Sequence, residues 1–95
     1  MMNKIELSFD KSISGLAGNT FGLQEYKKQA MELFDWNGMN EIIFPEHIKK
    51  IGISFIQGFF SEILSKIDID SIDNYISIKS SSEELTDKIM ENLKF

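Results

Sequence analysis

Few side chains in this sequence could carry out a reaction by themselves. The chain has one histidine, His47, and neither cysteine nor arginine. Without a thiol it cannot build a disulfide, a thiolate metal site or a cysteine nucleophile. No Gly-x-Ser-x-Gly turn is present to expose a serine nucleophile, and Glu46 would point away from His47 on an extended chain. We therefore predict no catalytic residue and no enzymatic activity, with a Ser-His-Asp group assembled only by the fold as the enzymatic alternative.

Two segments match ligand-binding loops only in part. The acidic stretch from Asp68 begins like a calcium loop, but its fifth, sixth and twelfth positions are Ile72, Asp73 and Lys79, where an oxygen ligand, Gly and Glu are required. Residues 14–19 precede a predicted helix, as phosphate-binding loops do, but lack the Gly-x-x-x-x-Gly-Lys pattern. We predict no metal site and no cofactor.

The other polar side chains of interest favour binding. The connection after Pro45 is rich in charge, and the helix that follows it opens with a hydroxyl. Ser54 and Gln57 fit a capping box, which predicts that the helix starts there. A phosphate on Ser54 would also be stabilised by the helix dipole, so Ser54 is the candidate phosphorylation site, with capping as the simpler role. We predict a partner-binding surface made of Glu46, His47, Lys49, Lys50, Ser54 and Gln57.

Three strands are expected to position these residues. Residues 4–9 alternate, with Ile5, Leu7 and Phe9 on one face, and residues 75–79 alternate in the same way. Residues 39–44 form a continuous apolar run, which is typical of a central strand covered on both faces.

Three helices alternate with the strands. Helical spacing of apolar residues predicts helices over about 20–36, from Ser54 to about residue 67, and from the Ser80–Glu84 capping signals to the C-terminus. The order β-α-β-α-β-α predicts a single α/β domain over residues 1–95, with a mixed or mostly parallel sheet and helices packed on it.

Composition and charge limit the classes of partner that this chain is expected to bind. The net charge of −5 and the absence of arginine weigh against nucleic acid and suit a basic protein surface. The start of the chain lacks a signal-peptide core and no apolar run could cross a bilayer, so we expect a cytoplasmic protein with no membrane contact. All ten basic residues are Lys, and Ile dominates the aliphatic residues while Val is absent. This bias is typical of proteins encoded by an A/T-rich genome, which favours a bacterial or phage source. Homo-oligomerisation stays open, through an apolar patch of Trp36, Tyr75 and Phe95.

Residues 42–44 and 52–64, a hydrophobic strand followed by a turn and a Ser-Phe pair that opens an amphipathic helix, resemble the core of the STAS-like domains of unknown function. Residues 15–22 resemble the Gly-containing loop before the family's earlier helix, and the similarity covers roughly residues 5–90. These are distant relatives of the anti-sigma-factor antagonist (STAS) domains. The resemblance implies partner binding through the second helix and its preceding loop, and phosphorylation of Ser54 by a kinase of the GHKL ATPase type. Ile43 stands where the family usually carries Asp, and the Asp-Ser-Gly context of the phosphorylated serine is absent.

Two functions follow as hypotheses. The first is a non-enzymatic STAS-like interaction module that regulates a bacterial partner, such as a GHKL-type ATPase or kinase. The alternative is an inhibitor of a host or defence protein, encoded by a phage or mobile element. Gene neighbourhood would separate them, because a prophage operon favours the inhibitor and a signalling operon favours the regulator.

Overall fold

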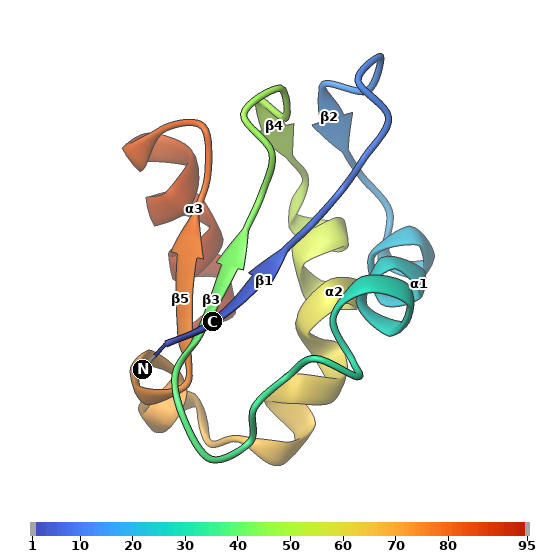
Figure 1. Cartoon of the computed structure of the whole chain (residues 1–95). Coiled ribbons are helices and arrows are strands. Elements are labelled where there is room, and N and C mark those ends of the chain that lie inside the picture. The colour runs from blue at the N-terminus through green and yellow to red at the C-terminus, as the bar shows by residue number, and fades with distance from the viewer. Residues whose placement is uncertain (1, 95) are drawn as a thin grey trace.

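The three predicted strands form one parallel sheet. In the computed structural model, which describes residues 2–94, β1 (Asn3–Glu6), β3 (Asn40–Ile43) and β5 (Ile76–Lys79) pair in the order β1-β3-β5. Parallel neighbours need crossover connections, which α1 (Asn19–Gln29) and α2 (Ile53–Lys66) provide, and α3 (Glu83–Leu93) follows β5 (Figure 1). The predicted α/β class, with a parallel sheet and helices packed on it, is confirmed.

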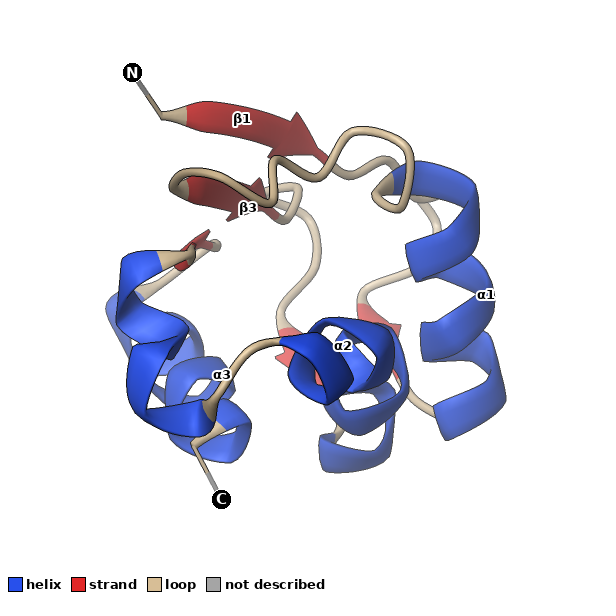
Figure 2. Cartoon of the chain, turned by 90° about the horizontal axis from the view of Figure 1, so that it is seen from below, coloured by secondary structure: helices blue, strands red, loops and turns tan. Residues whose placement is uncertain are grey.

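The helices cover only one face of this sheet. Figure 2 shows α1, α2 and α3 on the same side of the strands. Ile5 and Ile42 are fully buried on that side, whereas Glu41 and Ile43 stay partly exposed on the other. The prediction that residues 39–44 are covered on both faces is therefore wrong, although β3 is central. Because both right-handed crossovers move in one direction across the sheet, they place their helices on the same face.

A second, two-stranded parallel sheet lies in segments expected to be loops. β2 (Gly15–Leu16) pairs with β4 (Lys50–Ile51), with Gly15 opposite Lys50 and Leu16 opposite Ile51. Strands of two residues are too short to produce a periodic pattern, so they could not be predicted from the sequence.

The first helix is shorter than predicted. It ends at Gln29 rather than near residue 36, and the N–H groups of Ala30 and Met31 both donate to the Tyr26 carbonyl at 2.9 Å. The following residues form turns instead of continuing the helix. Leu33, which falls within the helix predicted over about 20–36, lies in these turns and is 59% exposed.

Two glycines bring α1 and α2 into backbone contact. A Cβ atom added at Gly22 would overlap the Phe55 carbonyl oxygen and lie 2.8 Å from the Phe59 nitrogen. A Cβ atom added at Gly58 would overlap the Asn19 carbonyl oxygen and lie 2.8 Å from the Asn19 carbonyl carbon. The close approach fixes the position of the start of α2 relative to the start of α1.

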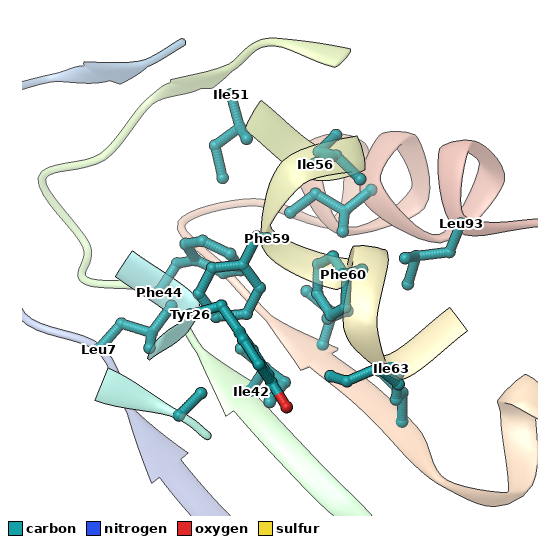
Figure 3. Packing of buried hydrophobic residues seen from close by; sticks show 14 of the residues in the cluster. Leu7, Tyr26, Ile42, Phe44, Ile51, Ile56, Phe59, Phe60, Ile63 and Leu93 are labelled. Atoms are coloured by element: carbon teal, nitrogen blue, oxygen red, sulfur yellow. The ribbon is translucent and has the colours of Figure 1, made fainter. Parts of the chain in front are cut away.

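The core fills the space between the sheet and α2. Tyr26 meets Phe59 edge to face at a centroid distance of 5.7 Å, and Phe59 meets Phe60 at 4.9 Å (Figure 3). The predicted apolar stripe of α2 is confirmed by the burial of Phe55, Ile56, Phe59, Phe60 and Ile63. Burial, with a smaller contribution from the charge of Glu62, raises the pKa of the Tyr26 hydroxyl, so this group stays neutral in the core.

One polar side chain is completely buried in the sheet. Asn40, at the start of β3, is 0% exposed. Its Oδ1 accepts from the Asp35 N–H at 2.7 Å and from Asn3 Nδ2 at 2.8 Å. Its Nδ2 donates to the carbonyl oxygens of Asp35, Gly38 and Tyr75. Asn40 therefore links the start of β1 and the residue just before β5 to the segment that leads into β3.

The C-terminal third follows the sequence closely. The acidic stretch forms a short 3-10 helix, η1 (Ile69–Asn74), in which Ile72 is buried and Ile69 is 45% exposed. Ser82 caps α3 by accepting the Leu85 N–H at 3.1 Å, as the capping signals predicted.

Of the three residues of the expected apolar patch, Trp36 and Tyr75 are each partly buried, and Phe95 lies outside the described residues.

The radius of gyration, 12.2 Å, equals the roughly 12 Å expected for a compact fold of this length. No helix within residues 2–94 combines the length and the apolar character needed to cross a bilayer.

Candidate functional site

The predicted surface residues lie at the end of the molecule where the strands of the main sheet finish. In open parallel sheets this end is where ligands usually bind, because the loops that follow the strands gather there. Here the loops after β1, β3 and β5 meet the small sheet of β2 and β4, at the top of Figure 1.

Backbone hydrogen bonds hold these loops together. The Lys49 N–H donates to the Ser14 carbonyl at 2.7 Å, and the Gly52 N–H donates to the Leu16 carbonyl at 2.7 Å. On the other side, Ser81 Oγ donates to the Ile48 carbonyl at 2.9 Å. The connection that carries the predicted surface is thus tied to two other segments, which limits the conformational entropy it would lose on binding.

Lys49 and Lys50 face α3. With Ser82, Glu84, Leu85 and Lys88 they line a hollow of about 250 Å³. The start of α3 was not part of the predicted surface, so the position of Ser82 and Lys88 beside these lysines was not foreseen from the sequence. Their helical spacing marks them only as a cap and an exposed position, and no local pattern connects them to the lysines of β4.

His47 turns toward a different segment. Its Nε2 lies 3.1 Å from the Asp10 carbonyl oxygen, and Asp10 Oδ1 accepts hydrogen bonds from Ser12 Oγ at 2.7 Å and from the Ser12 N–H at 2.8 Å. A serine, a histidine and an aspartate are therefore neighbours. Their order differs from that of an activated nucleophile, because the hydroxyl donates to the carboxylate and not to the imidazole.

The same contacts set the charge state of Asp10. The Ser12 hydroxyl, then the Ser12 N–H, and to a smaller extent the charge of His47, hold the pKa of this carboxyl below its ordinary value of 3.8. The Asp10–Ser12 turn thus favours the ionised carboxylate.

Ser54 does not cap its helix. α2 begins at Ile53, Gly52 occupies the N-cap with extended backbone angles, and no side chain accepts a hydrogen bond at this end. The predicted capping box of Ser54 and Gln57 is therefore wrong. Gly52 takes the cap position because its N–H is already bonded to Leu16 in the small sheet, so the helix starts as soon as β4 ends.

Instead, Ser54 joins two helices. Its Oγ accepts the Gly18 N–H at 3.2 Å, and Gly18 is the N-cap residue of α1, with a φ of +100° that favours glycine. Ser54 itself is exposed. The hydroxyl that the sequence singled out therefore lies at the junction of α1 and α2, where a new charge would act on both helix starts.

The remaining predicted residues, Glu46 and Gln57, are exposed, and no hydrogen bond joins them to the other four in residues 2–94. Between Lys50 and Ser54 lies Ile53, a large apolar side chain that is 51% exposed. The six predicted residues thus do not form one cluster. Lys49 and Lys50 line the α3 hollow, His47 contacts the Asp10 turn, and Ser54 and Gln57 lie at the start of α2. Glu46 is exposed in the loop after β3 and belongs to none of these three parts.

A larger hollow, of about 500 Å³, lies beside the edge strand β5 and the start of α3. Hydroxyl groups line it: Ser80 Oγ is 2.7 Å from Thr86 Oγ1 and donates to the Ser82 carbonyl at 2.9 Å. The Ser80 and Thr86 hydroxyls thus bond each other; Ser80 was expected only among the capping signals of the last helix, and no role was expected for Thr86.

Across the part of the chain that the structure describes, no three His, Cys, Asp or Glu side chains are grouped so that they could hold a metal ion. Comparison of the chain with protein-family models, with curated proteins and with solved structures gives no match.

Proposed function

We propose that the chain is a non-enzymatic interaction module of STAS-like type that regulates a partner protein in the bacterial cytoplasm. The STAS-like assignment, and the choice of a GHKL-type ATPase or kinase as the partner class, rest on the sequence resemblance, which covers roughly residues 5–90 and has its main motifs in residues 42–64. The binding surface is the connection from Pro45 to Gly52 together with the exposed start of α2.

The observation that carries the proposal is the position of Ile53. This side chain is half-exposed at the start of α2, with polar Lys50, Ser54 and Gln57 around it in the sequence. Protein interfaces commonly consist of an apolar centre with a polar rim, and a small number of buried apolar anchors carry most of the affinity. The hydrogen-bonded frame under Ile53 keeps this arrangement in place before binding.

Regulation would act through Ser54. A phosphoryl group on Ser54 Oγ would add roughly two negative charges, replace the hydrogen bond from the Gly18 N–H and lie beside Ile53. A partner that covers Ile53 would meet this charge directly, so we propose that phosphorylation of Ser54 weakens binding.

The test is co-elution of the purified chain with the proteins encoded beside its gene. We expect one of them to be retained by the wild-type chain, with a dissociation constant raised at least about tenfold by Ile53→Asp, the loss of one apolar anchor. Asp is well tolerated in the first turn of a helix, so this variant keeps its fold. Lys27→Glu, on the exposed face of α1, is the control and should bind like wild type. Unchanged binding of Ile53→Asp, or the absence of any retained neighbour, would refute the proposal.

A further inference from the structure

The hollow between β4 and α3 carries an unusual concentration of positive charge for this chain. Lys49, Lys50 and Lys88 all line it, against one carboxylate, that of Glu84. Three positive charges and one negative charge give a local formal charge of +2 on a chain whose net charge is −5.

In the part of the chain that the structure describes, none of these three lysines forms an ion pair. Within residues 2–94, the salt bridge found joins Lys94 Nζ to Asp73 Oδ2 at 2.9 Å, on another part of α3 and η1. Glu84 and Lys88 are one helical turn apart, a spacing that permits an ion pair, yet they form none. Like charges held together repel one another, and a bound anion would relieve that repulsion.

The frame of the hollow is fixed by the fold rather than by the lysines. Lys50 belongs to β4, paired with β2, and the Ser81 hydroxyl ties the start of the α3 segment to Ile48. The ammonium groups therefore extend from two anchored backbones that face each other across the hollow. An arriving anion would therefore meet two backbones that are already in place, and only the lysine side chains would have to adjust.

We propose that this hollow binds the carboxylate side chains of an acidic segment in a partner protein. The inference rests on the proposed function and specifies its chemistry, since Lys50 lies next to the Ile53 surface along the chain. A segment with several separate carboxylates matches three flexible ammonium groups spread over two elements better than one compact dianion does. Glu84 in the wall also disfavours a dense charge such as phosphate, and no arginine is present to bind one bidentately.

The inference reverses the expectation from net charge. A chain of net charge −5 suits a basic partner at long range, whereas the hollow selects acidic side chains at short range. Such a local complementarity contributes orientation and specificity more than affinity. It would fix how the partner sits on the Ile53 surface.

The experiment is a titration of the isotope-labelled full chain with a hexaglutamate peptide, followed by the amide signals in NMR spectra. We expect saturable shifts at Lys49, Lys50, Leu85 and Lys88, and a dissociation constant that rises about tenfold when the ionic strength increases from about 0.03 M to about 0.3 M. The triple variant Lys49→Gln, Lys50→Gln, Lys88→Gln should bind at least about tenfold more weakly.

The matched control carries Lys4→Gln, Lys27→Gln and Lys28→Gln, which change the net charge equally at exposed positions outside the hollow. It should bind hexaglutamate like the wild-type chain. Equal weakening in the control would mean that only net charge matters and would overturn the proposal, as would the absence of saturable binding. Tighter binding of inorganic phosphate at the same amides would overturn it in favour of a small-anion site.

The two proposals can fail separately. If a neighbour is retained through Ile53 but hexaglutamate does not bind, the lysine hollow has no such role and the interaction module stands. If hexaglutamate binds the hollow while Ile53→Asp leaves partner binding unchanged, the Ile53 surface is refuted and the acidic contact stands.

Discussion

Asn40 illustrates how one buried polar side chain can hold separate segments together. It is fully buried, and its amide group bonds to groups from Asn3, Asp35, Gly38 and Tyr75. A buried polar group that loses its partner costs about 1–3 kcal/mol, so the partners of Asn40 depend on it.

We therefore predict that Asn40→Ala lowers the free energy of unfolding by about 3 kcal/mol, because several backbone groups lose their partner at once. Urea unfolding followed by circular dichroism measures this change. Asn37→Ala is the control, since Asn37 is exposed and its side chain makes none of these bonds, and it should change stability by less than about 0.5 kcal/mol. Equal effects of the two variants would contradict the structural role of Asn40.

A second prediction at the residue scale concerns Asp10. Its pKa is held below 3.8 mainly by the two hydrogen bonds from Ser12. Because the folded-state value is below the unfolded one, the carboxylate contributes stability above pH 3.8 that is lost as the pH falls through the folded-state pKa.

Replacement of the hydroxyl tests this cause. In Ser12→Ala the pKa of Asp10 should rise toward 3.8, as measured by NMR titration of the carboxyl carbon. Ser14→Ala, which removes a nearby exposed hydroxyl that does not bond Asp10, should leave the pKa where it is. An Asp10 pKa that is the same in Ser12→Ala as in the wild-type chain would show that the hydroxyl is not what holds it down.

At the scale of elements, the contact between α1 and α2 depends on glycine. In an isolated helix, replacing an interior glycine with alanine stabilises by about 1 kcal/mol. At Gly22 and Gly58 a methyl group would instead meet the backbone of the other helix, which can move only if the helices separate.

Whether alanine at these two positions stabilises or destabilises the protein therefore tests the close contact between the helices. Gly22→Ala and Gly58→Ala should each destabilise by at least about 2 kcal/mol, measured by denaturant unfolding. Gly15→Ala is the comparison, because the nearest atoms to an added Cβ there are at an ordinary 3.7 Å, and it should change little. Stabilisation by either helix variant would mean that the helices pack less closely than described.

The starts of α2 and α3 give a further contrast. Ser82 is a true cap, whereas Ser54 lies inside α2 and bonds to Gly18 instead. We expect Ser82→Ala to cost about 1 kcal/mol. Ser54→Ala should cost about 0.5 kcal/mol, because water can replace the hydroxyl at the exposed Gly18 contact. The shift in the urea midpoint compares the two, and a larger cost at Ser54 would restore its role as the helix cap.

At the scale of the whole molecule, the two sheets should differ in how easily their hydrogen bonds open. β3 lies between two strands and under the helix layer. The Asn40 N–H, at its start, donates to the carbonyl of Tyr75 just before β5, and the Phe44 N–H, just after it, donates to the carbonyl of Lys79 in β5. The small sheet has only two residue pairs and lies at the loop end. Short, exposed pairings open locally, whereas central strands open with the whole fold.

Native-state hydrogen exchange should therefore give different opening free energies for the two sheets. The amides of Asn40 and Phe44 should exchange only by global unfolding, and those of Lys50 and Gly52 should exchange with an opening free energy lower by about 2 kcal/mol. Equal opening free energies would mean that the frame of the proposed binding surface unfolds only with the core. Such a result would make that surface more rigid than its short pairing implies.

The sequence by itself determined the elements that repeat a local pattern. The alternation of Ile5 and Leu7, and the helical stripe from Phe55 to Ile63, are properties of neighbouring residues, and the structure buries these side chains as predicted. The order of strands and helices then indicated a parallel sheet, because a strand, a helix and a strand connect most easily in that way.

Only the tertiary structure decided what depends on segments far apart in the chain. Gly15 pairs with Lys50, and Ser54 bonds to Gly18 instead of capping its helix. Lys88 joins Lys49 and Lys50 around one hollow although the sequence separates it from them by more than thirty positions. The free energy of such contacts comes from groups that meet only after the chain has folded, so no periodicity in the sequence records them.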